Sequence, residues 1–410
     1  MPVKPNLTQN KSVLSLFTLV RLYDSTVFRM VFPFLPALAR GLGVPVETVA
    51  VAVSARSVPG LIGPPLGAIA DMHGRKKALV WALIIFGFSM ALVGFFPTYA
   101  TFFIGMIISG GAIVIIDSSI HAYLGDKIPY IQRGKAMASV ELGWSLAFVI
   151  GIPLVGWGME HYGWSSPFIW LGVLGILLGG LVGLILPNQS RITGNWDELR
   201  FGLRQIIGKT PLLGLVLALL MTFGNQVISI VFGIWMENSF DLKVGQLGVA
   251  STVIGFAGIV GVGCAILFTD RLGKRKAVGL GIAVNSVICL VLPMVHSQLG
   301  FALATLFIFY LSFEFTITSL LPLMTTLSLQ ARGFFMAATQ AALSLGDALG
   351  ALVGPSLVQR GLVVNAACTL VINLCGLFIL AAFIRPLNID MPISDSLEKR
   401  NEPMEGDIPS

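Results

Sequence analysis

The sequence predicts an all-α integral membrane protein with two pseudo-symmetric six-helix bundles, about twelve transmembrane helices of roughly 20 residues each. Composition is the first reason: 55% of the 410 residues are hydrophobic and 11% are charged, whereas about a quarter of a soluble domain is charged. Apolar runs long enough to cross a bilayer also follow one another along nearly the whole chain. Finally, a charged stretch returns, altered, half a chain later, and such a repeat indicates two similar halves.

The repeat is carried by a charged loop that stands between two apolar segments in each half. An aspartate, a glycine and three basic residues recur at the same mutual spacing. The first copy contains Gly67, Asp71, Gly74 and Arg75, and the second contains Asp270 and Gly273.

Six helices are expected in each half, joined by short polar connections. The first six are expected at 12–39, 46–70, 77–96, 99–125, 134–159 and 165–187. The second six are expected at 211–238, 245–269, 276–296, 299–328, 333–360 and 362–385. The resulting domains are an N-terminal segment 1–11, an N-terminal bundle 12–187, a cytoplasmic linker 188–210, a C-terminal bundle 211–385 and a disordered tail 386–410. The tail is acidic and contains prolines, a composition that cannot form a core.

Glycine is unusually plentiful, with 46 residues. In lipid, small residues let helices approach closely. Gly346, Gly350 and Gly354 recur at intervals of four, so we expect them to form a packing face on their helix.

The basic residues indicate how the chain is oriented in the membrane. If the N-terminus is cytoplasmic, twenty of the 26 Lys and Arg residues fall on the cytoplasmic side. This positive-inside bias predicts a multi-pass protein of the cell membrane with both termini in the cytoplasm. Because the positive charge is distributed among these loops, the net charge of +6 does not indicate a nucleic-acid partner.

The chain shows no signature of catalysis. Its four cysteines, Cys264, Cys289, Cys368 and Cys375, lie in apolar helical contexts without disulfide or metal spacing. No nucleotide-binding loop and no Ser, His and Asp arrangement is supported by its context. We therefore expect a protein that is not an enzyme and that needs no metal and no cofactor.

The first charged loop resembles the signature of the major facilitator superfamily, Gly-x-x-x-Asp-Arg-x-Gly-Arg-Lys. The resemblance extends over about residues 12–385, since two six-helix halves carrying this loop are typical of the family. Helix 12–39, with Asp24-Ser25-Thr26 and Pro33-x-x-Pro36, looks like that of the drug:proton antiporters in the superfamily. Met72 stands where the family usually has a basic residue.

The family resemblance implies that the loop is a conformational latch. Asp71 would meet the positive N-terminal end of a helix from the other half, near Gly333. Arg75 would pair with Asp71 or with Asp126. The alternative interpretation is that the basic residues serve only as topology signals.

Several ionisable residues lie at bilayer depth, where they are costly and usually face a bundle interior or a wet cavity. Arg21 and Asp24, three residues apart, share a helical face and can pair, and Glu141 can hold Arg21 as well. Asp117 and His121 also share a face, and neither has a cation on its own helix. Because burial favours the protonated form of a carboxyl group, Asp117 is a candidate proton site, the alternative being a structural hydrogen bond.

The resemblance implies that the first, fourth, seventh and tenth helices line the cavity, which favours Asp24, Asp117 and Glu314 as substrate or proton sites. Glu314 lies between two phenylalanines, and aromatic rings attract a lipophilic cation. Asn225 and Gln226 offer neutral hydrogen bonds to a ligand or to a neighbouring helix. Arg56 and Asp347 are expected to form a salt bridge between the two halves.

Two directions of transport remain open from the sequence. Buried acids outnumber buried arginines, which favours a cationic or neutral lipophilic substrate over an organic anion. Together with the repeat and the charged loop, the buried acids favour proton-coupled efflux of a small amphipathic compound, and we expect a monomer. The alternative is uptake of a nutrient such as a sugar or carboxylate, with Arg21 or Arg29 binding the ligand. Small-molecule substrate, protons and the lipid bilayer are thus the expected partners.

Overall fold

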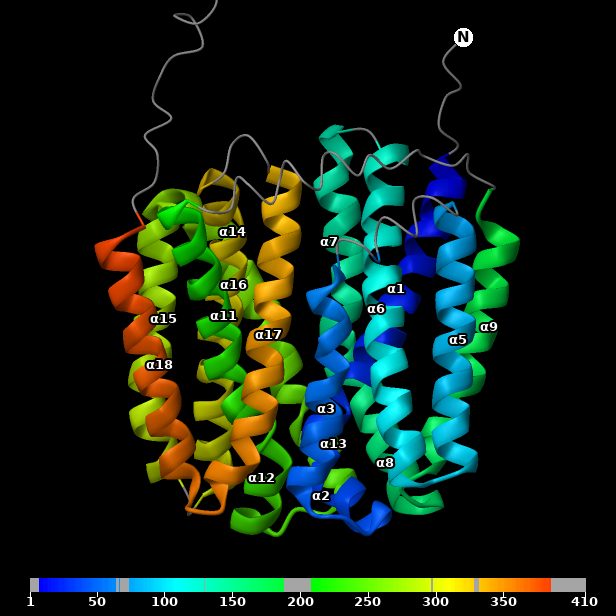
Figure 1. Ribbon diagram of the computed structural model, residues 1–410, viewed down its shortest axis with the longest axis horizontal. Coiled ribbons are helices and arrows are strands. Elements are labelled where there is room, and N and C mark those ends of the chain that lie inside the picture. Colours follow the sequence, from blue (N-terminus) through cyan, green and yellow to red (C-terminus); the bar gives the residue numbers. More distant parts are fainter. Residues whose placement is uncertain are drawn as a thin grey trace, which may run out of the picture.

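The computed structural model describes residues 7–63, 66, 74–128, 130–187, 208–295, 298–327 and 332–384, and within these ranges the secondary structure is helical (Figure 1). Ten segments of the described chain are long and apolar enough to cross a membrane. The first two expected spans do not reach that threshold, because α1 (Leu7–Arg29) carries buried charges and α3 (Val46–Leu61) has only 16 residues. The expected all-helical membrane fold is confirmed.

The chain forms the two groups of helices that the repeat predicts. The first group comprises α1, α2 (Val31–Leu42), α3, α5 (Arg75–Phe95), α6 (Tyr99–Lys127), α7 (Tyr130–Leu146), the π-helical turn η1 (Ala147–Gly151), α8 (Ile152–Tyr162) and α9 (Ser166–Ile185). The second comprises α11 (Lys209–Ser229), α12 (Phe232–Phe240), α13 (Val244–Ala250), α14 (Thr252–Leu272), α15 (Lys274–Val291), the 3-10 turn η2 (Leu292–Met294), α16 (Leu299–Leu327), α17 (Arg332–Val358) and α18 (Leu362–Ala382). Most of the expected linker and tail lies outside the described residues.

Four helices expected to be continuous are divided, and proline explains two of the breaks. Pro33 has no amide hydrogen to donate to the carbonyl group of Arg29, where α1 ends. Pro153 likewise cannot bond to the carbonyl group of Val149, which lies inside η1. The α-helix is thus interrupted between α1 and α2 and, at η1, between α7 and α8.

The glycine face expected on α17 packs against α11. A Cβ atom added to Gly346 would lie 2.3 Å from the carbonyl oxygen of Leu219, and one added to Gly350 would lie 2.8 Å from that of Phe223. One turn later, a Cβ atom added to Gly354 would lie 3.0 Å from the carbonyl oxygen of Val227. Any side chain at these positions would force the two helices apart.

The two bundles meet along α3 and α17, which lie side by side in the centre of Figure 1. Ser54 of α3 donates a hydrogen bond to the carbonyl oxygen of Ala348, at 2.9 Å. Further contacts join α2 to α12 and α8 to α13 at the end of the molecule where α2 leads into α3, here named the far end. There Arg40 forms an ion pair with Glu237 at 2.6 Å, and the amide of Gln359 donates to Glu47.

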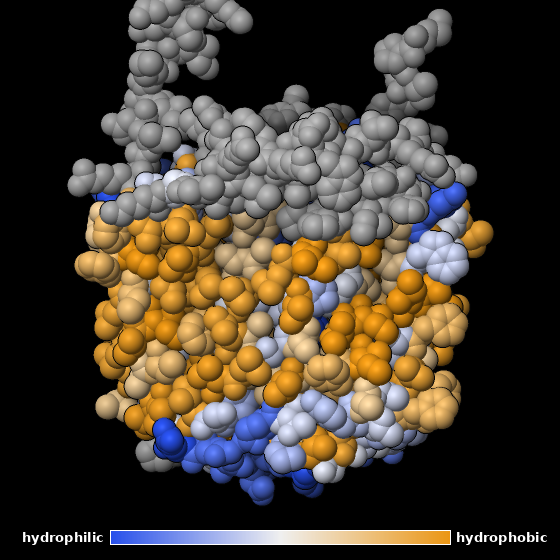
Figure 2. Space-filling view, in the orientation of Figure 1, coloured by the Kyte–Doolittle hydropathy of each residue, from blue (hydrophilic) through white to orange (hydrophobic). Residues whose placement is uncertain are grey.

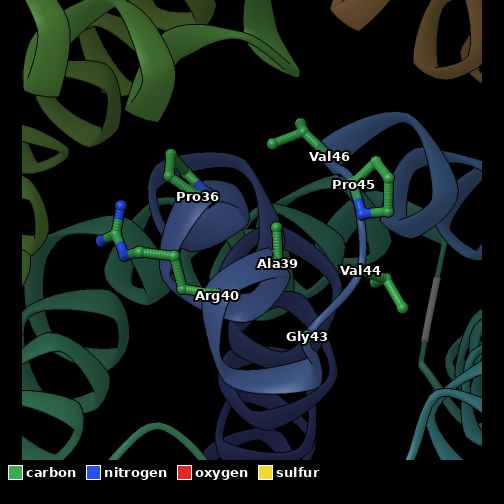
Figure 3. Close-up of a pocket in the computed structure, with 7 residues that line it drawn as sticks. All are labelled: Pro36, Ala39, Arg40, Gly43, Val44, Pro45 and Val46. Atoms are coloured by element: carbon green, nitrogen blue, oxygen red, sulfur yellow. The ribbon is translucent and has the colours of Figure 1, made fainter.

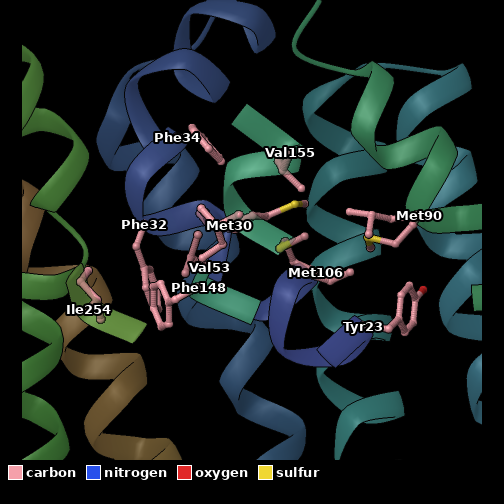
Figure 4. Packing of buried hydrophobic residues seen from close by; sticks show 14 of the residues in the cluster. Tyr23, Met30, Phe32, Phe34, Val53, Met90, Met106, Phe148, Val155 and Ile254 are labelled. Atoms are coloured by element: carbon pink, nitrogen blue, oxygen red, sulfur yellow. The ribbon is translucent and has the colours of Figure 1, made fainter. Parts of the chain in front are cut away.

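The outer surface and the interior are both apolar, as a bilayer requires. Figure 2 shows an apolar belt across the middle of the molecule and hydrophilic residues at the far end. Trp81, Phe88 and Leu184 belong to the exposed hydrophobic residues. The largest buried cluster contains residues of both bundles, including Met30, Phe148 and Ile254, which Figure 4 shows close together.

Candidate functional site

One arginine in the first bundle is surrounded by three carboxylates. Arg21 of α1 lies 3.4 Å from Asp24, one turn along the same helix, and 3.3 Å from Glu141 of α7. It also forms an ion pair with Asp117 of α6. These four residues, together with His121, are named the Arg21 cluster.

The close approach of α1 and α7 brings the cluster together. Gly143 has no side chain, and a Cβ atom there would lie 2.6 Å from the carbonyl oxygen of Thr18. The hydroxyl group of Thr18 donates to the carbonyl oxygen of Ser139 at 3.1 Å. The two backbones are therefore near enough for Glu141 to accept hydrogen bonds from both Nε and Nη2 of Arg21.

The three carboxylates differ in exposure. The side chain of Asp24 is 1% exposed and also accepts a hydrogen bond from Ser25 at 2.9 Å. The side chains of Asp117 and Glu141 are 31% and 42% exposed. The expected pairs of Arg21 with Asp24 and Glu141 are present. Asp117 obtains a cationic partner from another helix, Arg21 of α1.

His121 lies at the exposed edge of the cluster. Its Nδ1 atom is 3.0 Å from the carbonyl oxygen of Asp117, and its Nε2 atom is 3.3 Å from Oε1 of Glu141. Among the described residues, no group of three His, Cys, Asp or Glu side chains is arranged to hold a metal ion. The centre of this cluster is occupied by the Arg21 guanidinium group.

A second group of polar and aromatic residues lies between the bundles and is named the inter-bundle site. The guanidinium carbon of Arg29 is 3.3 Å from the ring centre of Trp144 and 4.9 Å from that of Phe148. Glu314 of α16 interacts electrostatically with Arg29 and forms a side-chain contact with Trp144. Tyr310, one turn from Glu314, donates a hydrogen bond to Ser229 at 2.8 Å.

Arg29 is buried without a direct acidic partner in the described part of the chain. The residue is 7% exposed, and its Nε atom has no hydrogen-bond partner. Aromatic faces attract a guanidinium group, so the rings of Trp144 and Phe148 hold the charge that no carboxylate contacts.

The expected salt bridge between Arg56 and Asp347 is not formed as a direct contact. Arg56 donates to the carbonyl oxygen of Phe28 at 2.5 Å, and its guanidinium carbon lies 3.7 Å from the centre of that ring. Asp347 interacts electrostatically with both Arg29 and Arg56. The nearby backbone carbonyl and aromatic face hold Arg56 on the side of the first bundle.

Asn225 and Gln226 occupy adjacent positions on α11 with different surroundings. Gln226 is 4% exposed and packs against Gly350 of α17. The side-chain oxygen of Asn225 is buried and accepts no hydrogen bond. Asn225 therefore has a buried acceptor without a partner, whereas Gln226 packs between α11 and α17.

The described part of the expected latch is an ion pair within the first bundle. Arg75 pairs with Asp126 and donates to the carbonyl oxygen of Ala122 at 2.9 Å. Gly74 and Gly273 have φ angles of 90° and 83°, a backbone conformation that favours glycine, so the repeat extends to backbone geometry. Asp270 is exposed near the end of α14. Gly67 and Asp71 lie outside the described residues.

Two surface hollows at the far end are separate from the buried charges. The larger, of about 430 Å³, is lined by residues of the α2–α3 turn, including Pro36, Arg40 and Pro45 (Figure 3). The smaller, of about 350 Å³, lies beside the Arg40–Glu237 ion pair. Neither contains a residue of the Arg21 cluster or of the inter-bundle site.

Sequence reasoning did not single out Trp144, Phe148 or Tyr310. Helical spacing could have identified two of them. Trp144 follows Glu141 by three residues, and Tyr310 precedes Glu314 by four, so each shares a helix face with a buried acid.

Comparison with known proteins gives the family. The sequence profile of the Major Facilitator Superfamily matches residues 17–351. The uncharacterized MFS-type transporter YwfA of Bacillus subtilis is 28% identical over 369 residues, which are 86% of this chain and 87% of YwfA. Multidrug resistance protein 2 of the same organism is 23% identical over 338 residues, covering 79% of this chain and 83% of the relative.

A solved structure shows the same fold. The inward open conformation of the xylose transporter XylE from E. coli superposes with a TM-score of 0.74 at 14% identity, covering 93% of this chain and 98% of XylE. The fold and the sequence profile agree. The chain therefore belongs to the Major Facilitator Superfamily of membrane transporters.

Proposed function

We propose that this protein is a monomeric secondary active transporter that exports a small amphipathic cation or neutral compound in exchange for protons. It acts in the cell membrane with both termini in the cytoplasm and catalyses no chemical reaction. The observation that carries proton coupling is the excess of acid in the Arg21 cluster, where one guanidinium group faces three carboxylates. Like charges held close together favour uptake of a proton.

The inter-bundle site supports a lipophilic substrate. Trp144, Phe148 and Tyr310 supply ring faces, and the carboxyl group of Glu314 attracts a cation. The buried amide oxygen of Asn225 adds a hydrogen-bond acceptor. Export is also in keeping with the name of one relative, Multidrug resistance protein 2.

In an alternating-access mechanism, the contacts at the far end keep that end closed while the other end is open. With both termini in the cytoplasm, this end faces outward, and the Arg40–Glu237 and Glu47–Gln359 contacts close it. Substrate then enters from the cytoplasmic side, and rocking of the bundles breaks these contacts to release it. The Arg75–Asp126 pair and the charged loop around it act at the opposite end as part of the latch.

A direct experiment measures proton movement that depends on substrate. Purified protein is reconstituted in liposomes with an internal pH dye, and ethidium is added as the cationic probe. Ethidium-dependent proton movement is expected in the wild type and is lost in Glu314→Gln or Asp117→Asn. Asp241→Asn, an exposed carboxylate at the far end, is the matched control. Wild-type coupling in both site variants would disprove the assignment.

Arg29 supports a second candidate function, uptake of a carboxylate. Its buried charge has no ion pair among the described residues, and an anionic ligand would supply one. The fold is also that of the xylose transporter XylE. Counterflow of a labelled carboxylate or a labelled sugar into preloaded liposomes, abolished in Arg29→Gln, would favour uptake over export.

A further inference from the structure

His121 is placed between two groups that accept hydrogen bonds. Its Nδ1 atom lies 3.0 Å from the backbone carbonyl oxygen of Asp117, one turn earlier on α6. Its Nε2 atom lies 3.3 Å from Oε1 of Glu141 on α7. A carbonyl oxygen has no proton to donate, so Nδ1 must carry one.

The second contact requires another proton. In a neutral imidazole with its proton on Nδ1, the Nε2 lone pair would face the carboxylate oxygen of Glu141 and repel it. The other oxygen, Oε2, accepts hydrogen bonds from Nε and Nη2 of Arg21 at 3.4 and 3.3 Å. Arg21 thus holds Glu141 in its ionised form. The additional proton resides on Nε2, and His121 is an imidazolium group.

We propose that His121 and Glu141 form a proton-binding site of this transporter, with His121 as the group that takes up and releases the proton. The inference rests on the proposed proton coupling and assigns it to a pair of residues. On release, the Nε2–H bond breaks and the proton passes to water. Neutral His121 then loses its contact with Oε1 of Glu141, and the cluster retains Arg21 against three carboxylates.

Water can reach the pair. The side chains of His121 and Glu141 are 45% and 42% exposed, in contrast to Asp24 at 1%. Charged groups left uncovered by protein at this depth face an aqueous path rather than lipid, because exposure to lipid is costly. The other charged groups that interact with the pair are Arg21 and Asp24 on α1, Asp117 on α6 and Glu314 on α16.

Helix α7 connects this site to the inter-bundle site. Glu141 and Trp144 are three residues apart and share a helix face. The guanidinium carbon of Arg21 lies 5.4 Å from the centre of the Trp144 ring. The guanidinium group of Arg29 stacks on the same ring, and Trp144 also contacts Glu314. When His121 loses its proton, Arg21 is the cationic partner that remains for Glu141. If Arg21 then moves toward Glu141, its guanidinium group changes position relative to the Trp144 ring.

Histidine NMR of the full chain tests the protonation directly. Protein with labelled histidine rings is purified in detergent, and His121→Gln assigns the His121 signals. His161 is an internal control, because its Nδ1 atom makes the same contact with a carbonyl oxygen one turn earlier, at 2.9 Å, without an acidic partner among the described residues. Near neutral pH we expect both His121 nitrogens to be protonated, and the ring signals of His121 to differ from those of His161.

Variants at Glu141 complete this test. Glu141→Gln and Glu141→Asp, which remove the charge or shorten its reach, are expected to leave only Nδ1 of His121 protonated. The inference is overturned if His121 in the wild type has the same ring signals as His161, or if its signals do not change in either variant.

A transport measurement separates this inference from the proposed function. Ethidium movement is driven by an imposed pH gradient in proteoliposomes, and ethidium exchange is measured without a gradient. We expect His121→Gln to retain ethidium exchange but to lose the ethidium movement that is driven by the pH gradient, together with the dependence of that movement on pH. His161→Gln is expected to behave as the wild type. Gradient-driven movement that persists in His121→Gln overturns the inference. If the wild type itself shows no gradient-driven movement of ethidium while the His121 signals are those of an imidazolium, proton-coupled cation export fails and the proton-binding pair remains.

Discussion

The guanidinium group of Arg29 is stacked on the indole ring of Trp144, 3.3 Å from its centre. Arg29 reaches this position from α1 and Trp144 from α7, two helices that are held together by the close approach at Gly143. Trp144 also contacts Glu314 of the second bundle. The indole ring therefore touches a buried cation of its own bundle and an acid of the other.

The first prediction concerns this stack. Trp144→Ala is expected to lower the thermal stability of the purified protein, because a desolvated cation–π contact contributes about 2 kcal/mol. Trp144→Phe retains a ring and should lose less. Trp81→Ala, at an exposed tryptophan on α5, is the control for loss of indole surface. Equal melting temperatures for Trp144→Ala and the wild type would contradict a role for the stack.

A second prediction concerns charge balance in the Arg21 cluster. Arg21→Met leaves the buried carboxylate of Asp24 without a cation, and loss of one partner from a buried pair costs about 3–5 kcal/mol. The double variant Arg21→Met/Asp24→Asn should recover part of the loss, since the amide carries no charge. Thermal unfolding in detergent gives the comparison, and a double variant no more stable than Arg21→Met would show that Asp24 is not the group left uncompensated.

The glycine face of α17 gives a third prediction. Gly350→Val places a side chain 2.5 Å from Cβ of Gln226, and overpacking of this kind costs about 1–3 kcal/mol. Gly263→Val is the matched control, because no atom lies within 4 Å of the position of its Cβ atom. We expect a lower melting temperature only for Gly350→Val. Similar losses in the two variants would indicate a general effect of valine in these helices.

The ion pair at the far end gives a fourth prediction. In a background with the four native cysteines replaced by serine, Glu47→Cys and Gln359→Cys place two thiols at contacting positions across the bundles. Arg40→Glu should slow their cross-linking by up to about fivefold, because an exposed ion pair contributes about 0.2–1 kcal/mol. Adding Glu237→Arg exchanges the two charges, so that an ion pair forms again, and should restore the rate of cross-linking. An unchanged rate in Arg40→Glu would show that the pair does not hold this end closed.

Local signals in the sequence were sufficient for the scaffold. Apolar runs of spanning length gave the helices, since each run must bury its backbone groups within itself. The repeat of Asp and Gly predicted the pseudo-symmetry, and Gly74 and Gly273 indeed adopt the same backbone conformation. Spacing of four predicted the face at Gly346, Gly350 and Gly354, because residues four apart lie on one side of a helix.

The sequence predicted only in part which side chains of different helices form ion pairs or hydrogen bonds with each other. Spacing alone paired Arg21 with Asp24, whereas Asp117 lacked a visible cation until α6 and α1 were placed together. From the sequence, Arg56 is expected to pair with Asp347. The structure instead gives it the carbonyl oxygen and ring of Phe28, because helix rotation decides which groups a long side chain meets.

The sequence by itself thus determined a two-bundle membrane transporter fold and the set of buried charges within it. Only the tertiary structure decided which charges are shared, which one is held by aromatic rings, and that His121 lies between two acceptors. The physical reason is the distance along the chain between interacting residues. Helix formation and membrane insertion depend on neighbours along the chain, whereas partners of Arg21, Arg29 and His121 come from α6, α7 and η1, whose rotation and separation are set by packing.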